Sequence, residues 1–196
     1  MAAPKVFIIL LNWNNWSETR ECLESLGRAI YSNCEVIIVD NGSTNGDAEK
    51  VRGGVGRGIP IFNKKNLGFA GGNNVGIKYA MAHGADYVML LNNDVVVSDG
   101  WLESLVKSLE CDEKIGMVGP ITNSISGRQM VNSIPYTDDA GFHEFSQKIR
   151  KACYGRLTPR YRIAGFAVLL KKSLYEDVGG LDESFGTGNY EDDDLC

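Results

Sequence analysis

Three apolar runs, each ending abruptly in polar side chains, constrain the fold of this 196-residue chain more than any other feature. The runs cover residues 5–11, 35–39 and 87–91. Continuous apolar runs of this length are typical of strands that are buried on both faces of a sheet. We therefore expect at least three central strands, followed at once by Asn12, Asp40 and Asn92 respectively.

Strand and helix patterns alternate through the first 120 residues. Further strands are expected at 59–62, 115–118 and 163–170, and helices at 17–27, 46–52, 73–83, 101–110 and 173–178. Ser17, Asn73 or Asn74, and Ser98 or Asp99 are the expected caps of three of these helices. Residues 52–58 are predicted to form a glycine-rich loop, and residues 123–162 a mobile loop or a helical insertion. The alternation predicts an α/β fold, a three-layer sandwich with a mostly parallel central sheet and right-handed crossovers.

Composition and charge exclude several classes of protein. Hydrophobic residues make up 43% of the chain, yet no run of 18 apolar residues spans a membrane, and the first residues lack a signal-peptide layout. Five cysteines without a Cys-x-x-Cys spacing favour a reducing compartment over a disulfide framework or a zinc site. The negative net charge and the lack of a basic helix with interleaved aromatics argue against nucleic acid as a partner.

The charges are unevenly distributed along the second half. Residues 145–175 hold eight Lys or Arg and no acid, and residues 176–196 hold eight acids and no base. One interpretation is two solvated surfaces that complement each other. The other interpretation is a basic face that binds an anionic acceptor or a membrane surface, beside the acidic entrance of a catalytic site. We therefore expect a cytoplasmic protein with possible contact at the inner face of the membrane.

In parallel sheets, ligands bind beyond the carboxyl ends of the strands, which is where the polar residues of this chain collect. Asp40 could simply be a residue that stabilises a turn, or it could accept a hydrogen bond from the N3–H of a uracil or thymine ring. Trp13 could be a core aromatic, or it could stack on that ring. Residues 66–76 contain four glycines and form either a flexible helix-capping loop or a cradle for phosphate and hydroxyl oxygens.

Two acidic positions are candidates for the chemistry itself. Asp94 ends a strand and could hold Mg²⁺ or Mn²⁺ against the two phosphates of a nucleotide-diphosphate, although Asn92 and Asn93 supply no second carboxylate. The run of Glu191, Asp192, Asp193 and Asp194 could be an acidic tail. Carboxylates this close resist full ionisation, so one pKa is expected to rise, which suits a general base.

Six segments in this order resemble the family 2 glycosyltransferases of the GT-A fold, with the rhamnosyltransferase-like members as the nearest subtype. The segments are residues 39–43, 66–76, 90–95, 165–170, 179–185 and 191–196. The resemblance implies inverting transfer of a sugar from a UDP- or dTDP-linked donor to a hydroxyl of a saccharide or lipid-linked acceptor. This activity would belong to polysaccharide, cell-wall or glycolipid synthesis.

The resemblance also implies roles for individual residues. Asp40 matches the base-reading aspartate, Asp94 the metal-holding position of the Asp-x-Asp motif, and Asp192 the catalytic base, with Glu191 beside it. Asn92 stands where the first acid of that motif is usual. The implied donor-binding set is Leu11, Trp13, Asp40, Asn66, Gly68, Phe69, Asn73, Asn92 and Asn93.

We expect residues 1–196 to form a single catalytic domain that is truncated on its acceptor side, because family members usually continue past the base. Two rival functions remain open. A sugar-phosphate nucleotidyltransferase would need a glycine-rich loop after the first strand, where residues 12–16 contain no glycine. A nucleotide-sugar-binding or scaffold domain would bind the donor without turnover. The sequence leaves the oligomeric state open.

Overall fold

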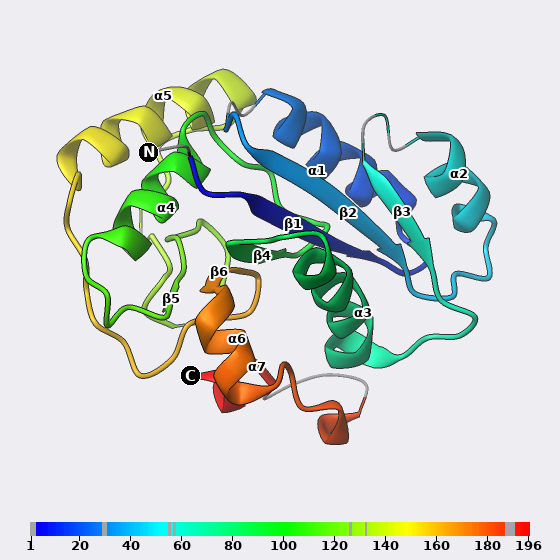
Figure 1. The fold of residues 1–196 in the computed structure, drawn as a ribbon. Helices are drawn as coiled ribbons and strands as arrows, with labels where there is room; N and C mark the ends of the chain where they lie inside the picture. Colours follow the sequence, from blue (N-terminus) through cyan, green and yellow to red (C-terminus); the bar gives the residue numbers. More distant parts are fainter. Residues whose placement is uncertain are drawn as a thin grey trace.

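A six-stranded sheet with helices on both faces forms the centre of the molecule (Figure 1). The computed structural model describes residues 3–28, 31–54, 56, 58–125, 127–131, 133–186 and 191–196, and in the last of these segments the side chains from Asp193 onward. The strands are β1 (Val6–Asn12), β2 (Cys34–Asp40), β3 (Ile59–Phe62), β4 (Tyr87–Leu91), β5 (Met117–Val118) and β6 (Ala167–Lys171). The helices are α1 (Trp16–Arg28), α2 (Asp47–Gly54), α3 (Gly68–Ala82), α4 (Trp101–Glu110), α5 (Asp139–Ala152), α6 (Lys172–Val178) and α7 (Glu191–Leu195), with a 3-10 turn at Glu183–Phe185.

The strand order is β3-β2-β1-β4-β6-β5, and the first four strands run parallel. β6 is antiparallel to both β4 and β5. The predicted α/β fold with a mostly parallel central sheet is therefore confirmed. Because β6 runs in the opposite direction, it begins at the edge where β1, β2 and β4 end.

Side chains of β1 alternate between two apolar cores, one on each face of the sheet. Val6, Ile8 and Leu10 pack with residues of α1, α2 and α4. Phe7 and Ile9 pack on the other face with residues of α3 and α6, and α3, α6 and α7 gather on one side of the sheet in Figure 1. Each of these five side chains is at most 2% exposed, so burial contributes about 1.5–3 kcal/mol apiece to folding.

Several helix boundaries differ from the sequence expectation. α3 begins at Gly68 rather than at Asn73 or Asn74, and α2 continues to Gly54 into the expected loop. α4 follows Gly100 in a left-handed conformation, with no side-chain cap from Ser98 or Asp99. α1 begins at Trp16, whose N–H donates to the Asp47 carboxylate at 2.9 Å, so a residue distant in sequence satisfies the free amide.

The segment that the sequence left open, residues 123–162, contains α5 as a helical insertion. The Asp138 carboxylate accepts a hydrogen bond from the Gly141 N–H at 2.8 Å and caps this helix. No α5 residue is fully buried, so the helix lies at the surface of the fold with one half-buried face. Within the described residues, no helix is both long and apolar enough to cross a bilayer.

Candidate active site

The carboxyl ends of β1, β2 and β4 meet at one edge of the sheet and bring three polar loops together. Asn12 of β1 lies directly beside Asp40 of β2 in the strand register. The N–H of Asn92, just after β4, donates to the Phe166 carbonyl at 2.8 Å, which places the chain before β6 at the same edge. The candidate site therefore receives residues from four strands.

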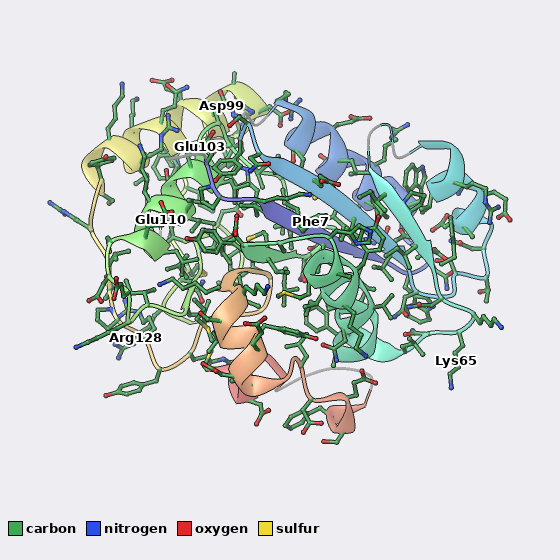
Figure 2. All side chains as sticks on the ribbon, viewed as in Figure 1. Phe7, Lys65, Asp99, Glu103, Glu110 and Arg128 are labelled. Carbon is green, nitrogen blue, oxygen red and sulfur yellow. The ribbon has the colours of Figure 1, made fainter. Side chains whose placement is uncertain are left out.

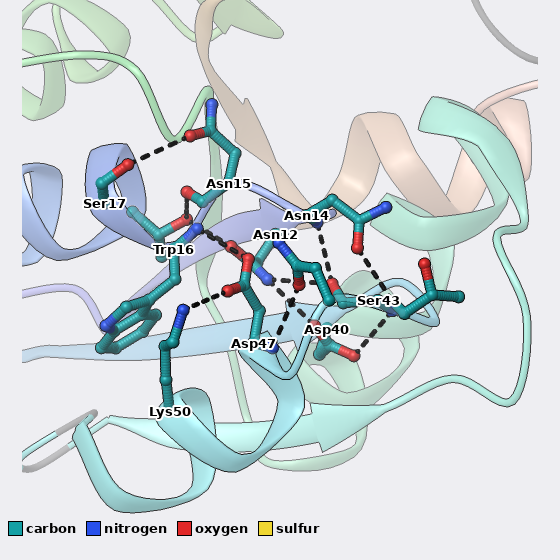
Figure 3. Close-up of polar contacts among 12 residues, drawn as sticks. Asn12, Asn14, Asn15, Trp16, Ser17, Asp40, Ser43, Asp47 and Lys50 are labelled. Carbon is teal, nitrogen blue, oxygen red and sulfur yellow. Dashed lines mark hydrogen bonds and ion pairs between the residues drawn. The ribbon is translucent and has the colours of Figure 1, made fainter.

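A buried polar network occupies the β1–β2 part of this edge (Figure 3). The Asn12 amide nitrogen donates to the Asp40 carboxylate at 2.9 Å and to the Ser43 hydroxyl at 3.2 Å. The Ser43 N–H donates to the other Asp40 oxygen at 3.1 Å, which closes the predicted turn. Asn12 is 0% exposed and Asp40 is 2% exposed, so Asp40 is both a turn residue and a buried acceptor.

The same network extends to the loop after β4. The Thr19 hydroxyl of α1 donates to the Asn12 amide oxygen at 2.8 Å. The Asn93 amide nitrogen donates in turn to the Thr19 oxygen at 2.9 Å. A continuous chain of hydrogen bonds thus joins Asp40 to Asn93, the neighbour of Asp94. Asn93, predicted to bind the donor, fixes the β4 loop to α1 in this structure.

Replacing Asn12 with alanine is expected to lower the free energy of unfolding by about 3 kcal/mol, because the Asp40 carboxylate would remain buried without its amide donor. Urea denaturation followed by circular dichroism measures this change. Asn45→Ala is the matched control, because Asn45 is exposed and its side chain bonds to Asp47 in the same loop rather than to a buried carboxylate of another strand. That control is expected to cost at most about 1 kcal/mol. Equal losses for the two variants would contradict the structural role of Asn12.

Asp47 supports the start of α1 beneath this network. It is 1% exposed, and burial by itself raises the pKa of its carboxyl group. Hydrogen bonds from Lys50, Trp16 and Asn45 outweigh burial, and the pKa is lowered from its usual value. Asp47 therefore stays ionised near neutral pH and holds Trp16 and Lys50 in the positions shown in Figure 3.

A second amide network shapes the loop before α3. The Asn41 amide nitrogen donates to the Asn66 side-chain oxygen at 2.9 Å, and the same oxygen accepts from the Gly68 N–H at 2.8 Å. The Asn41 oxygen accepts from the Leu67 N–H at 3.1 Å. Asn41 is 1% exposed. Asn66, predicted to bind the donor, therefore also determines where α3 begins.

The glycines of the 66–76 stretch allow α3 to pack closely on the sheet. A Cβ atom at Gly72 would lie 2.4 Å from a Leu11 methyl group, and one at Gly76 would lie 2.7 Å from a methyl group of Ile9. Most of the stretch predicted as a helix-capping loop or a ligand cradle is thus a helix packed on β1, with Gly68 at its first position.

Two asparagines on α3 make contacts within the protein. Asn73 is 2% exposed and its amide donates to the Phe69 carbonyl at 2.9 Å, so its predicted donor contact gains no support and stays a prediction. Asn74 donates to the Leu181 carbonyl at 2.9 Å and accepts from the Leu181 N–H at 3.1 Å. This pair of bonds ties α3 to the segment before the 3-10 turn.

A cleft of about 870 Å³ opens beside the β4 loop. Phe69, Asn92 and Asp94 line it together, so the second residue of α3 and the β4 loop share one space. Asp94 is exposed and Asn92 is half-buried. The other walls are residues 95–96, 122–125, 134 and 136–139, Phe142, and residues 162 and 164–166.

Cys22 supports the β4 loop from below. Its thiol is 3.9 Å from the Asn92 carbonyl oxygen, to which it donates. Burial, and secondly the charge of Asp94, raise the pKa of Cys22 to about 12. The thiol therefore stays protonated and contributes packing rather than a metal-binding thiolate.

The acidic end of the chain reaches the wall of this cleft. Asp193 of α7 forms an ion pair with Arg162, and Arg162 lines the cleft. The Cys196 sulfur accepts from the Ile163 N–H at 3.2 Å, which packs α7 against the segment before β6. The backbone of Glu191 and Asp192 belongs to α7, but their side chains lie outside the described residues.

The structure thus groups the predicted residues into three sets. Phe69, Asn92 and Asp94 line the cleft; Gly68 and Asn73 of α3 and Asn93 of the β4 loop belong to the same elements but are not among its lining residues. The set beside β1 and β2 is Leu11, Trp13, Asp40 and Asn66. Trp13 is 52% exposed and therefore available for stacking rather than part of the core. Sequence reasoning missed Asn12, Thr19, Asn41 and Arg162, because only tertiary contacts show what these common polar residues do.

The donor set for a metal ion is small. In the part of the chain that the structure describes, no group of three or more His, Cys, Asp or Glu side chains is arranged to hold a metal. An exposed Asp94 carboxylate beside the Asn92 amide still offers the oxygen ligands that Mg²⁺ and Mn²⁺ prefer. These residues fit an ion that takes its remaining ligands from substrate phosphates and water.

Comparison with known proteins agrees with this architecture. Residues 7–177 match the family model of glycosyl transferase family 2. The chain is 32% identical over 179 residues to the poly-beta-1,6-N-acetyl-D-glucosamine synthase of Staphylococcus aureus (strain COL), which covers 88% of this chain and 41% of the relative. It is 29% identical over 196 residues to the pre-mycofactocin glycosyltransferase of Mycobacterium tuberculosis (strain CDC 1551 / Oshkosh). This match covers 97% of this chain and 38% of the relative.

A solved structure shares the fold across the whole chain. The mannosyltransferase PcManGT from Pyrobaculum calidifontis, in complex with GDP-Man and Mn²⁺, superposes with a TM-score of 0.67 at 18% identity, covering 100% of this chain and 51% of that one. This likeness concerns the fold, the GT-A fold predicted from the sequence. The chain spans between 22% and 41% of the length of the curated relatives it matches.

Proposed function

This chain belongs to glycosyl transferase family 2, and on that premise we propose that it performs inverting, metal-assisted sugar transfer from a nucleotide-diphosphate sugar to a hydroxyl. The supporting observation is that Asp94 and Arg162 line one cleft. Arg162 forms an ion pair with Asp193, which follows the predicted base Asp192 in the sequence. That the chain belongs to the rhamnosyltransferase-like subtype of the family stays a prediction.

We place the nucleotide of the donor over the ends of β1 and β2. The exposed ring of Trp13 supports stacking on a base, and Asp40 would accept the N3–H of uracil or thymine through lone pairs not used by Asn12 and Ser43. The ribose and diphosphate would follow Leu11, Asn66, Gly68 and the first turn of α3 toward Asn92. The free N–H groups of a helix start favour phosphate oxygens.

Asp94 and the donor diphosphate would together hold Mg²⁺ or Mn²⁺. Bound there, the ion would neutralise charge on the departing diphosphate. The chain's own contribution is to fix the β4 loop: Asn93 is bonded to Thr19, and the Asn92 N–H to Phe166. In solved structures the mannosyltransferase PcManGT is in complex with GDP-Man and Mn²⁺, and TarS of S. aureus is in complex with UDP.

Asp192 would act as the general base, with Glu191 beside it. It would take the proton of the acceptor hydroxyl as that oxygen attacks the anomeric carbon from the face opposite the diphosphate. The new bond forms as the bond between the anomeric carbon and the phosphate oxygen breaks, so the configuration at the anomeric carbon inverts. The Arg162–Asp193 pair supports this assignment because it holds α7 at the wall of the cleft.

We propose a saccharide or lipid-linked acceptor in polysaccharide, cell-wall or glycolipid synthesis, with the reaction in the cytoplasm or at the inner face of the membrane. The five cysteines, none of which forms a disulfide within the described residues, support a reducing compartment.

Thermal unfolding in the presence of UDP, dTDP or GDP, with Mn²⁺ or with EDTA, tests donor binding directly. A ligand that binds only the folded state at 100 times its dissociation constant stabilises the protein by about 2.7 kcal/mol. We expect UDP or dTDP with Mn²⁺ to raise the melting temperature more than either with EDTA. No shift with any nucleotide would overturn the proposal. Binding without release of nucleotide from any donor sugar would favour the scaffold function instead.

A further inference from the structure

A second cavity, of about 550 Å³, lies between α4 and α5, and its walls are mainly apolar. Phe142, Phe145 and Ile149 of α5 face it from one side, spaced three and four residues apart along the helix. Trp101 and Leu105 of α4 face it from the other. Because α5 has no fully buried residue, its apolar face remains open toward this space.

The charged residues that line the cavity are all cations. They are Lys107, Arg150 and Arg156; no Asp or Glu is among the lining residues. Arg150 donates to the Asp99 carbonyl at 2.9 Å, which leaves Lys107 and Arg156 exposed at the rim. Apolar walls with a cationic rim complement a molecule that has a hydrocarbon tail and an anionic head.

The chain that follows α5 extends this rim into a surface. Every residue from 151 to 162 is exposed, and this run holds four cations and no acid. Its apolar side chains are also exposed: Tyr154 at 74%, Leu157 at 42% and Tyr161 at 102%. The Lys107 ammonium lies 6.0 Å from the centre of the Tyr154 ring, which joins the run to α4. Cations interleaved with exposed apolar side chains are typical of segments that lie on anionic bilayers.

We propose that the α4–α5 cavity binds the acyl tail of an anionic membrane lipid, with Lys107 and Arg156 on its phosphate and residues 151–162 on the bilayer surface. Lys107 and residues 153–157, which are exposed lining residues, form the entrance on this side. This cavity adjoins the cleft and shares part of its wall, including Phe142 and residues 122–123, but the proposal does not depend on the proposed function. Tail burial provides the apolar part of the affinity, and the basic run provides an electrostatic part that salt weakens.

Vesicle binding by the full 196-residue chain tests this site. We expect the protein to sediment with vesicles of phosphatidylcholine and phosphatidylglycerol, but not with phosphatidylcholine alone. The double variant Lys107→Gln, Arg156→Gln is expected to reduce partitioning by roughly tenfold or more. The double variant Lys64→Gln, Lys65→Gln changes the net charge equally; Figure 2 shows Lys65 at the opposite end of the molecule from α4 and α5. This control is expected to change partitioning by less than about twofold.

Fluorescence quenching tests whether the tail enters the cavity. Phosphatidylglycerol with brominated acyl chains is expected to quench the wild-type emission, and Trp101→Phe, checked for folding by circular dichroism, is expected to lose most of that quenching. Vesicle binding with equal quenching in both proteins would show surface contact alone and overturn the proposal. A dimer that forms without lipid and excludes vesicles would assign the cavity to a second copy and also overturn it.

Discussion

Replacing Asp192 with asparagine is expected to lower the rate of sugar transfer by a factor on the order of 10² to 10⁴, because the amide cannot take the proton of the acceptor hydroxyl. The affinity for UDP or dTDP with Mn²⁺ is expected to remain unchanged, since this residue is assigned to the acceptor side. Single-turnover transfer measures the first quantity, and isothermal titration of the nucleotide measures the second, in a preparation whose wild type shows transfer.

Asp177→Asn on α6 is the matched control for this variant. It removes one exposed carboxylate from a helix on the same side of the sheet as α7, without touching the cleft lining. Its transfer rate is expected to stay within about twofold of wild type, in keeping with ordinary surface substitutions. Retained transfer in Asp192→Asn would reassign the base to Glu191 or to another carboxylate. A parallel loss of nucleotide affinity would show that the substitution disturbed the donor site instead.

Replacing Asp94 with alanine is expected to remove the gain in nucleotide affinity that Mn²⁺ provides, a change of at least about tenfold. Transfer is expected to fall by a further factor on the order of 10², because charge on the departing diphosphate is no longer neutralised. The reason is the position of this exposed carboxylate in the cleft, next to Asn92. Titrating UDP or dTDP with Mn²⁺ and with EDTA separates the two effects.

Asp99→Ala is the control for this second variant, because Asp99 is another exposed carboxylate in the same β4–α4 connection but lies outside the cleft lining. Its metal-dependent affinity is expected to match wild type. The metal assignment would be refuted if Asp94→Ala bound the nucleotide in Mn²⁺ as tightly as the wild type does. In that case Mn²⁺, compared with EDTA, would raise its affinity as much as it raises that of the wild type. The ion would then depend on groups other than this carboxylate.

The sheet could be predicted from the sequence because its strands are short, continuous and apolar. β1, β2 and β4 are buried on both faces, and such strands need no partner information to be recognised. The direction of β6 could not be predicted in the same way. An apolar run reads equally well in either direction, so its antiparallel pairing with β4 appears only in the folded chain.

The position of some site residues could be predicted from the sequence, and that of others could not. Asp94 and Asn92 follow β4 directly, and a strand end fixes its next residues in space, so their shared cleft was predictable. The 66–76 stretch was harder to interpret, because glycine serves both ligand approach and close helix packing. Only the structure shows that Gly72 serves packing, since a Cβ atom there would lie 2.4 Å from a Leu11 methyl group, while the role of this stretch in donor binding stays a prediction. Arg162 is one of many cations in a basic run until its contact with Asp193 distinguishes it.

The sequence by itself determined the fold class, the edge of the sheet that bears the candidate site and the polar residues released there, because apolar strands that alternate with helices imply parallel strands whose carboxyl ends share one edge. The tertiary structure alone decided which polar groups bond to one another. Asn12, Thr19 and Asn93 come from separate elements, and the bonds that join them to Asp40 span up to 74 residues of chain. Local pattern carries no record of such contacts, whereas burial makes each one necessary, since an unpaired polar group in that interior would destabilise the fold.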